Sequence, residues 1–188
     1  MTRPQLVLVR HGQTEWSEAG RHTSRTDVPL TPEGELEAAD LRERLAGRTF
    51  ALVLVSPRLR ALETARLAGL ESRAAVDSDL VEWDYGEYEG RTTAEIRVSA
   101  PGWTIWAAGA PGGESPADVA ARADRVLAHV GDAAGDVLLV AHGHFLRVLT
   151  ARWLGLGAAA GRFFRLDPAS LSELGHERDE QVVLRWNA

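Results

Sequence analysis

The chain has 188 residues, and its 21 basic and 27 acidic side chains give a formal net charge of −6. Its hydrophobic fraction of 45% and charged fraction of 26% are typical of a globular protein and exclude wholesale disorder. The length favours a single domain over residues 1–188. Because the chain is acidic overall, we expect no nucleic-acid partner and no binding to anionic membranes.

Two residue types are missing from the sequence. Cys is absent, which excludes disulfides, thiol nucleophiles and thiolate metal sites and fits a reducing, cytoplasmic location. All 21 basic residues are Arg, so phosphate-binding loops and Schiff bases that depend on Lys are excluded. No apolar run approaches the roughly 18 residues that span a bilayer, and we expect no signal peptide. Cationic chemistry must therefore come from Arg and His.

Strands and helices are predicted to alternate along the chain. Short runs of Val and Leu predict buried strands, and a cap residue followed by Pro predicts where helices begin. The predicted elements are a strand over Gln5–Val9, a helix from Thr31 to Gly47, a strand over Ala51–Val55, a helix from Ser56 to about Leu70, an irregular aromatic segment over Val76–Gly113, a helix from Ser115 to about Gly131, a strand over Asp136–Val140, a helix over Phe145–Trp153, and strands over Arg162–Leu166, Leu171–Leu174 and Val182–Trp186.

This order of elements predicts an α/β fold. Right-handed crossovers would build a three-layer sandwich, with a mostly parallel central sheet and helices on both faces. The last two strands are separated by a polar segment and are expected to form a hairpin at an antiparallel edge. In the first helix, we expect Leu36, Ala39, Leu41 and Leu45 to form the apolar stripe.

Three predicted strands end in residues that suggest chemistry. They run into Arg10-His11-Gly12, into Ser56-Pro57-Arg58-Leu59-Arg60 and into Ala141-His142-Gly143-His144. If the strands are parallel, these residues meet at one edge of the sheet, where ligands bind in such folds. Arg offers a planar fork of donors for phosphate or carboxylate, and a neutral imidazole is a nucleophile.

A metal site is the competing interpretation of the same edge. His142 and His144 have the spacing of a chelating pair. Arg10 and Arg60 would repel a divalent cation there, so we favour an anion site without metal.

These residues belong to a longer pattern. Arg10-His11-Gly12-Gln13-Thr14-Glu15-Trp16 resembles the Arg-His-Gly signature of the histidine phosphatase superfamily, which includes cofactor-dependent phosphoglycerate mutases. Five further blocks resemble family blocks in the family order. They are Asp27–Gly34, Ser56–Ala61, Glu82–Gly90, and Gly112–Ser115 followed by Ala141–His144. The resemblance covers nearly the whole chain and implies the phosphoglycerate mutase-like fold.

The resemblance also implies roles for individual residues. His11 would be the nucleophile that forms a phosphohistidine, and Arg10, Arg60 and His142 would hold the phosphoryl oxygens. Glu82 would be the general acid and base; the residues alone do not choose it over nearby acidic side chains. The positions that match the substrate pocket are Gln13, Ser17, Thr23, Ser24, Tyr85, Gly143 and His144. No metal or other cofactor is implied.

Four other residues remain open at this stage. Arg58 is either a cation on the helix surface or a phosphate contact. Trp103 and Trp106 are either a pocket wall or core, and His22 is a candidate for the substrate loop.

We predict a phosphomonoesterase that acts on a small phosphorylated metabolite, such as a sugar phosphate. The mutase branch typically has Asn where this chain has Ser17, and it adds basic residues in the middle segment, where Arg97 is the single one between Thr92 and Ser115. A phosphoglycerate mutase and a non-catalytic phosphate-binding protein on the same fold are the alternatives. A homo-oligomer is left open.

Overall fold

The computed structural model describes residues 4–188. Its centre is one six-stranded sheet with the strand order β3-β2-β4-β1-β5-β6. The strands are β1 Leu6–Arg10, β2 Leu52–Val55, β3 Ala74–Val76, β4 Val137–Ala141, β5 Leu171–Glu177 and β6 Glu180–Arg185. The α-helices are α1 Glu15–Glu18, α2 Pro32–Arg44, α3 Leu59–Leu67, α4 Thr93–Ser99, α5 Ile105–Ala108, α6 Pro116–Gly131 and α7 Gly143–Trp153. Three short 3₁₀ helices are η1 Ser78–Leu80, η2 Gly86–Tyr88 and η3 Ala158–Phe163.

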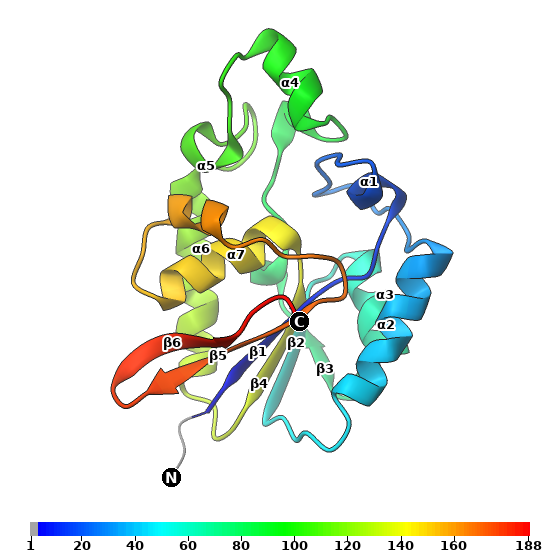
Figure 1. Ribbon diagram of the computed structural model, residues 1–188, viewed down its shortest axis with the longest axis vertical. Coiled ribbons are helices and arrows are strands. Elements are labelled where there is room, and N and C mark those ends of the chain that lie inside the picture. Colours follow the sequence, from blue (N-terminus) through cyan, green and yellow to red (C-terminus); the bar gives the residue numbers. More distant parts are fainter. Residues whose placement is uncertain (1–3) are drawn as a thin grey trace.

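The sheet separates two hydrophobic clusters, which confirms the predicted three layers. Leu8 and Leu139 pack in the cluster that contains the buried side chains of α6 and α7. Val7 and Leu138, one residue earlier on the same strands, pack in the cluster of α2 and α3. Figure 1 shows α2 and α3 on one side of the sheet and α6 and α7 on the other. Strands buried on both faces explain why these runs are apolar without alternation.

Strand direction places the candidate residues together. β4 pairs in parallel with both β1 and β2, and Arg10 lies opposite Ala141 at the end of this register. The residues after β1, β2 and β4 therefore leave the sheet at one edge. β5 pairs antiparallel with β1 and with β6, so the predicted hairpin at an antiparallel edge is confirmed.

The helix starts follow the predicted caps. The hydroxyl of Thr31 accepts from the backbone N–H of Gly34, and Ser115 forms a capping box with Asp118. The helix predicted from Ser56 to Leu70 is shorter, because Ser56 and Pro57 remain outside α3. The sequence thus predicts that this helix is present but misplaces its ends.

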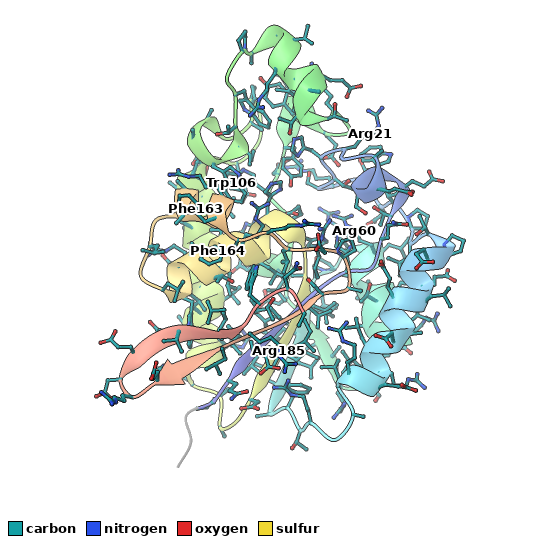
Figure 2. The ribbon with its side chains drawn as sticks, in the orientation of Figure 1. Arg21, Arg60, Trp106, Phe163, Phe164 and Arg185 are labelled. Carbon is teal, nitrogen blue, oxygen red and sulfur yellow. The ribbon has the colours of Figure 1, made fainter. Side chains whose placement is uncertain are left out.

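Several predicted details are wrong. Arg162–Leu166 is not a strand: η3 occupies its start, and Phe163 is 72% exposed (Figure 2). In α2, Leu36 and Ala39 are exposed; the buried face is formed by Gly34, Ala38 and Leu41, and continues at Leu45. β3, a three-residue edge strand, was not predicted.

The segment predicted to be irregular contains α4 and α5 and the short helices η1 and η2. In Figure 1, α1 and α4 lie beyond the edge of the sheet at which β1, β2 and β4 end. Trp103 is buried in this segment, where its indole N–H donates to the carbonyl of Gly109 at 2.9 Å. Among residues 4–188, no helix is long and apolar enough to cross a membrane.

Candidate active site

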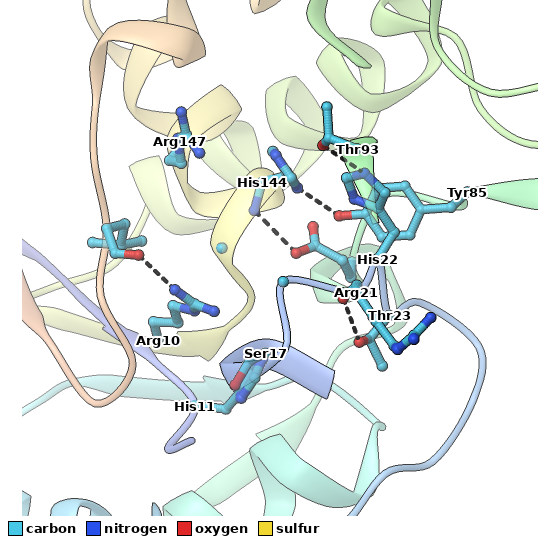
Figure 3. Close-up of a pocket in the computed structure, with 14 residues that line it drawn as sticks. Arg10, His11, Ser17, Arg21, His22, Thr23, Tyr85, Thr93, His144 and Arg147 are labelled. Carbon is cyan, nitrogen blue, oxygen red and sulfur yellow. Dashed lines mark hydrogen bonds between the residues drawn. The ribbon is translucent and has the colours of Figure 1, made fainter. Parts of the chain in front are cut away.

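A cavity of about 260 Å³ opens at this edge of the sheet (Figure 3). Its walls come from the end of β1, the start of α7, α1 and the loop after it, the segment that carries Glu82, the start of α4 and the chain after η3. The lining residues are Arg10, His11, Ser17, Gly20, Arg21, His22, Thr23, Glu82, Tyr85, Thr93, Gly143, His144, Arg147 and Leu166.

His11 lies directly after β1 and is 5% exposed. Its Nδ1 is 2.8 Å from the carbonyl oxygen of Gly12, which can only accept, so Nδ1 carries the ring proton. Burial, followed by the positive charges of Arg60 and Arg10, holds the pKa of His11 well below its usual value. The ring is therefore neutral at physiological pH, and Nε2 carries the free lone pair.

Arg10 brings a positive charge to the cavity beside His11. Its Nη1 donates to the carbonyl of Leu166 at 2.6 Å, whereas its buried Nε has no partner among the described residues. Gly143 packs closely against this side chain, since a Cβ on Gly143 would lie 3.4 Å from the Arg10 Nε. An unpaired buried donor is costly, so this arrangement favours binding of an anion.

Arg60 and His142 lie next to His11 but not on the cavity wall. Both are fully buried, and the His142 and His11 rings are 5.1 Å apart. The Arg60 Nε donates to Nδ1 of His142 at 3.2 Å, and His142 Nε2 donates to the hydroxyl of Ser56 at 2.7 Å. For His142 to hold a phosphoryl oxygen, its Nε2 must exchange Ser56 for that oxygen.

Arg60 also fixes the loop that forms one wall of the cavity. It lies in the first turn of α3 (Figure 2), and its guanidinium donates to the carbonyls of Thr23, Ser24 and Thr26 at 3.1 to 3.2 Å. Burial lowers the pKa of Arg60, and the charge of Glu82 opposes that shift. Arg60 thus joins α3, the loop and His142 around one buried charge.

Glu82 is held at the N-terminus of α7. Its Oε1 accepts from the backbone N–H groups of Trp83 and Phe145, both at 2.8 Å, and its Oε2 accepts from that of His144 at 3.0 Å. These donors fix the carboxylate in the cavity and stabilise its negative charge, as does the helix N-terminus.

Tyr85, which is buried, and His144, which is half-buried, form a pair on the same wall. The Tyr85 hydroxyl is 2.5 Å from Nδ1 of His144, and the His144 ring is 4.9 Å from that of Trp106. Burial raises the pKa of Tyr85 well above 10 and lowers the pKa of His144 well below its usual value. Both side chains are neutral and offer polar atoms without charge.

Five of the seven predicted substrate-binding residues line the cavity, and two do not. Ser17, Thr23, Tyr85, Gly143 and His144 line it. The side-chain oxygen of Gln13 instead accepts from the hydroxyl of Thr31 at 2.8 Å. Ser24 is buried, and its hydroxyl donates to Glu89 at 2.6 Å. Gln13 and Ser24 therefore support the loops behind the cavity.

Besides His22, five lining residues were not among the predicted site residues: Gly20, Arg21, Thr93, Arg147 and Leu166. The Arg147 guanidinium lies 4.4 Å from the Trp106 ring centre. These residues come from four separate segments, and only the regular spacing of Arg147 on the helix after His144 could have indicated its position. His22 does line the cavity, as expected of a substrate-loop residue. Trp106 does not line the cavity and packs against the ring of His144.

Arg58 does not reach the cavity, and His142 and His144 are not arranged as a chelating pair. Arg58 donates to the carbonyl of Arg25 at 3.2 Å and does not line the cavity. Both ring nitrogens of His142 are used by protein partners, and Nδ1 of His144 pairs with Tyr85. Among residues 4–188 there is no group of three His, Asp or Glu side chains placed to hold a metal ion. The donors of this edge therefore do not fit a metal centre.

Residues 6–188 match the family model of the histidine phosphatase superfamily, branch 1. The chain belongs to this superfamily. This histidine phosphatase is 46% identical over 180 residues to an acid phosphatase of Mycobacterium tuberculosis, a match that covers 92% of this chain and 87% of that protein. It is 36% identical over 186 residues to sedoheptulose 1,7-bisphosphatase of Saccharomyces cerevisiae, with 82% and 69% covered.

Solved structures agree with the fold of this histidine phosphatase. The product of an open reading frame of Mycobacterium tuberculosis superposes with a TM-score of 0.93 at 42% identity, covering 98% of this chain and 97% of that chain. The predicted phosphoglycerate mutase-like fold and the predicted family are therefore confirmed.

Proposed function

We propose that this histidine phosphatase hydrolyses the phosphomonoester of a small metabolite, such as a sugar phosphate, through a phosphohistidine on His11. The observation that carries the proposal is the state of the His11 ring. The bond from Nδ1 to Gly12 and the lowered pKa leave a neutral Nε2 as nucleophile in a cavity that also contains Arg10 and Glu82. A neutral imidazole needs no separate base before it attacks phosphorus.

In the first step, the His11 Nε2 lone pair forms a bond to phosphorus while the bond from phosphorus to the ester oxygen breaks. The carboxyl group of Glu82 gives a proton to the leaving oxygen, so an alcohol departs rather than an alkoxide. Arg10, with its unpaired Nε, stabilises the transferring phosphoryl oxygens. The buried charge of Arg60 acts in the same direction beside His11.

In the second step, water attacks the phosphohistidine. The Glu82 carboxylate takes a proton from this water, the bond from phosphorus to nitrogen breaks, and inorganic phosphate leaves with His11 neutral again. The three backbone donors that stabilise the carboxylate suit the form of Glu82 that this step requires. Glu82 ends the cycle protonated and ready for the next ester.

Hydrolysis is favoured over phosphoryl transfer to a second position of the substrate, because the segment between Thr92 and Ser115 has few basic residues. Arg97, the single basic residue between Thr92 and Ser115, donates to the carbonyl of Trp103 at 2.9 Å, so one of its donors is already used. The relatives support the substrate class, since one is named an acid phosphatase and another acts on a sugar bisphosphate.

The test is phosphate release from a panel of sugar phosphates, phosphoglycerates and nucleotides, with p-nitrophenyl phosphate as the general substrate. His11→Ala removes the nucleophile, and His129→Ala is the matched control at a mostly exposed histidine on α6. We expect His11→Ala to lose turnover on every substrate and His129→Ala to keep it. Efficient conversion of 3-phosphoglycerate to 2-phosphoglycerate in the presence of the bisphosphate would contradict the proposal.

A further inference from the structure

An ion pair between a buried arginine and a half-buried glutamate lies behind the segment that carries Glu82. Arg122, in the middle of α6, is 8% exposed, and its Nε and Nη2 donate to the two carboxylate oxygens of Glu114 at 2.7 and 2.8 Å. Neither residue is among the described residues that line the cavity. Because burying the Arg122 charge is costly and the pair does not line the cavity, its role is sought in the other groups that it contacts.

Arg122 holds the backbone that leads into Glu82. Its Nη1 donates to the carbonyls of Asp79 and Val81 at 2.7 and 2.9 Å, and its Nη2 reaches the carbonyl of Glu82 itself at 3.4 Å. Residues 81–85 belong to no helix or strand, so no sheet or helix hydrogen bonds fix this part of the chain. The guanidinium of Arg122 instead donates hydrogen bonds to the carbonyl groups on one side of this segment.

Glu114 holds the residues that follow Glu82. Its Oε2 accepts from the backbone N–H of Asp84 at 2.9 Å, and its carbonyl accepts from the indole N–H of Trp83 at 2.9 Å. The Arg122 guanidinium also lies 4.9 Å from the ring centre of Phe145, whose backbone N–H donates to the Glu82 carboxylate. The ion pair therefore contacts the chain before Glu82, the chain after it and one of its carboxylate donors.

We infer that the Arg122–Glu114 ion pair is the positioning device of the general acid, and that it sets where the Glu82 carboxyl group lies relative to the leaving oxygen. This inference rests on the proposed role of Glu82. Arg122 and Glu114 act through Glu82 and do not touch the substrate. Arg is required because one planar fork must serve a carboxylate and three carbonyls together, which the single ammonium of Lys does not do.

A misplaced acid has a specific kinetic signature. Glycerol 2-phosphate releases a strongly basic alkoxide unless it is protonated, whereas p-nitrophenyl phosphate releases a weakly basic phenolate that needs little help. The value of kcat/KM includes the step in which the alcohol leaves and the phosphoenzyme forms. Loss of acid positioning therefore lowers kcat/KM far more for glycerol 2-phosphate than for p-nitrophenyl phosphate. A general loss of folded protein lowers both equally.

The experiment compares these two substrates for Arg122→Met, Arg122→Lys, Glu114→Gln and Glu82→Gln. Arg125→Met is the matched control, because Arg125 lies one turn further along α6 and its guanidinium donates to the carboxylate of Asp79. We expect Arg122→Met to lower kcat/KM about tenfold to a hundredfold more for glycerol 2-phosphate than for p-nitrophenyl phosphate. Arg125→Met should leave the ratio unchanged, and Glu82→Gln should change it most.

Thermal unfolding and circular dichroism show which variants fold. If Arg122→Met does not fold, Arg122→Lys and Glu114→Gln carry the same comparison, and each should change the ratio in the same direction. In a Glu82→Gln background, Arg122→Lys should change the ratio no further.

Two results would overturn the inference in distinguishable ways. If Glu82→Gln changes the ratio and the folded Arg122 and Glu114 variants lose both activities equally, the ion pair is structural and the proposed role of Glu82 stands. If Glu82→Gln itself leaves the ratio unchanged, Glu82 is not the general acid, and the inference falls with that role.

Discussion

The buried neutral ring of His22 should make the stability of the protein depend on pH. His22 is 8% exposed, and its ring packs 4.7 Å from that of Tyr85 and 5.5 Å from that of Trp103. Burial lowers its pKa to about 4, although the charge of Glu89 acts in the opposite direction. As the pH falls, the unfolded chain therefore takes up a proton at this position before the folded protein does.

The direction and the size of the effect follow from linkage. The stability that the neutral His22 ring contributes is fully present above pH 6.5, which is about the pKa of this histidine in the unfolded chain. It is lost as the pH falls toward the pKa of about 4 in the folded protein. A pH of about 5 lies roughly 1.5 units below the pKa of His22 in the unfolded chain. At about 1.4 kcal/mol per unit, the unfolding free energy at that pH is lower by about 2 kcal/mol.

The assay is urea unfolding of the wild type and of His22→Phe at about pH 7 and about pH 5. The pKa values of His11, His142 and His144 are lowered as well, but these residues remain in both proteins, so their effect cancels in the comparison. We expect the loss of unfolding free energy between the two pH values to be about 2 kcal/mol smaller in His22→Phe. An equal loss in both proteins would refute the claim that His22 is neutral in the fold.

Three further predictions concern packing, a buried charge and metals. A Cβ on Gly34 would lie 2.1 Å from the carbonyl oxygen of Gln13, so Gly34→Ala should lower the unfolding free energy by about 1–3 kcal/mol. Gly131→Ala is the control and should not lower it, because a Cβ there meets open space. Equal melting temperatures for the two variants would contradict this prediction. Arg60→Met removes a donor from four acceptors, of which only the Thr26 carbonyl keeps another bond within the described residues, from the backbone N–H of Val28. It should cost about 3–5 kcal/mol in urea unfolding, and a cost under about 1 kcal/mol would count against the bonding described. Hydrolysis of p-nitrophenyl phosphate should be the same with and without EDTA; abolition by the chelator would restore the metal interpretation.

The layers and the site edge could be predicted because they depend on local patterns. Runs such as Leu6–Val9 and Val137–Val140 are apolar without interruption, and that pattern occurs where a strand is buried on both faces. Parallel strands then bring His11 and His142 to one edge. By contrast, β3 has only three residues, two of them exposed, and carries no such pattern.

The parts of the site that could not be predicted depend on tertiary contacts. Nothing local distinguishes Gln13, which bonds to Thr31, from Ser17, which lines the cavity. Arg21 enters the cavity from the loop after α1, and the sequence alone does not indicate that this arginine reaches it. The Arg162–Leu166 segment has strand-like composition, yet no neighbouring strand pairs with it among the described residues.

The central claim, that His11 is phosphorylated on Nε2, is tested most directly by trapping the phosphoenzyme. Rapid quenching at alkaline pH during turnover of a ³²P-labelled ester, followed by peptide mapping, identifies both the labelled residue and the labelled nitrogen. We expect one label on His11, attached to Nε2, because Nδ1 donates to Gly12. The label should be absent in His11→Ala and present in His129→Ala. Normal labelling of His11→Ala, or attachment at Nδ1 of His11, would contradict the mechanism.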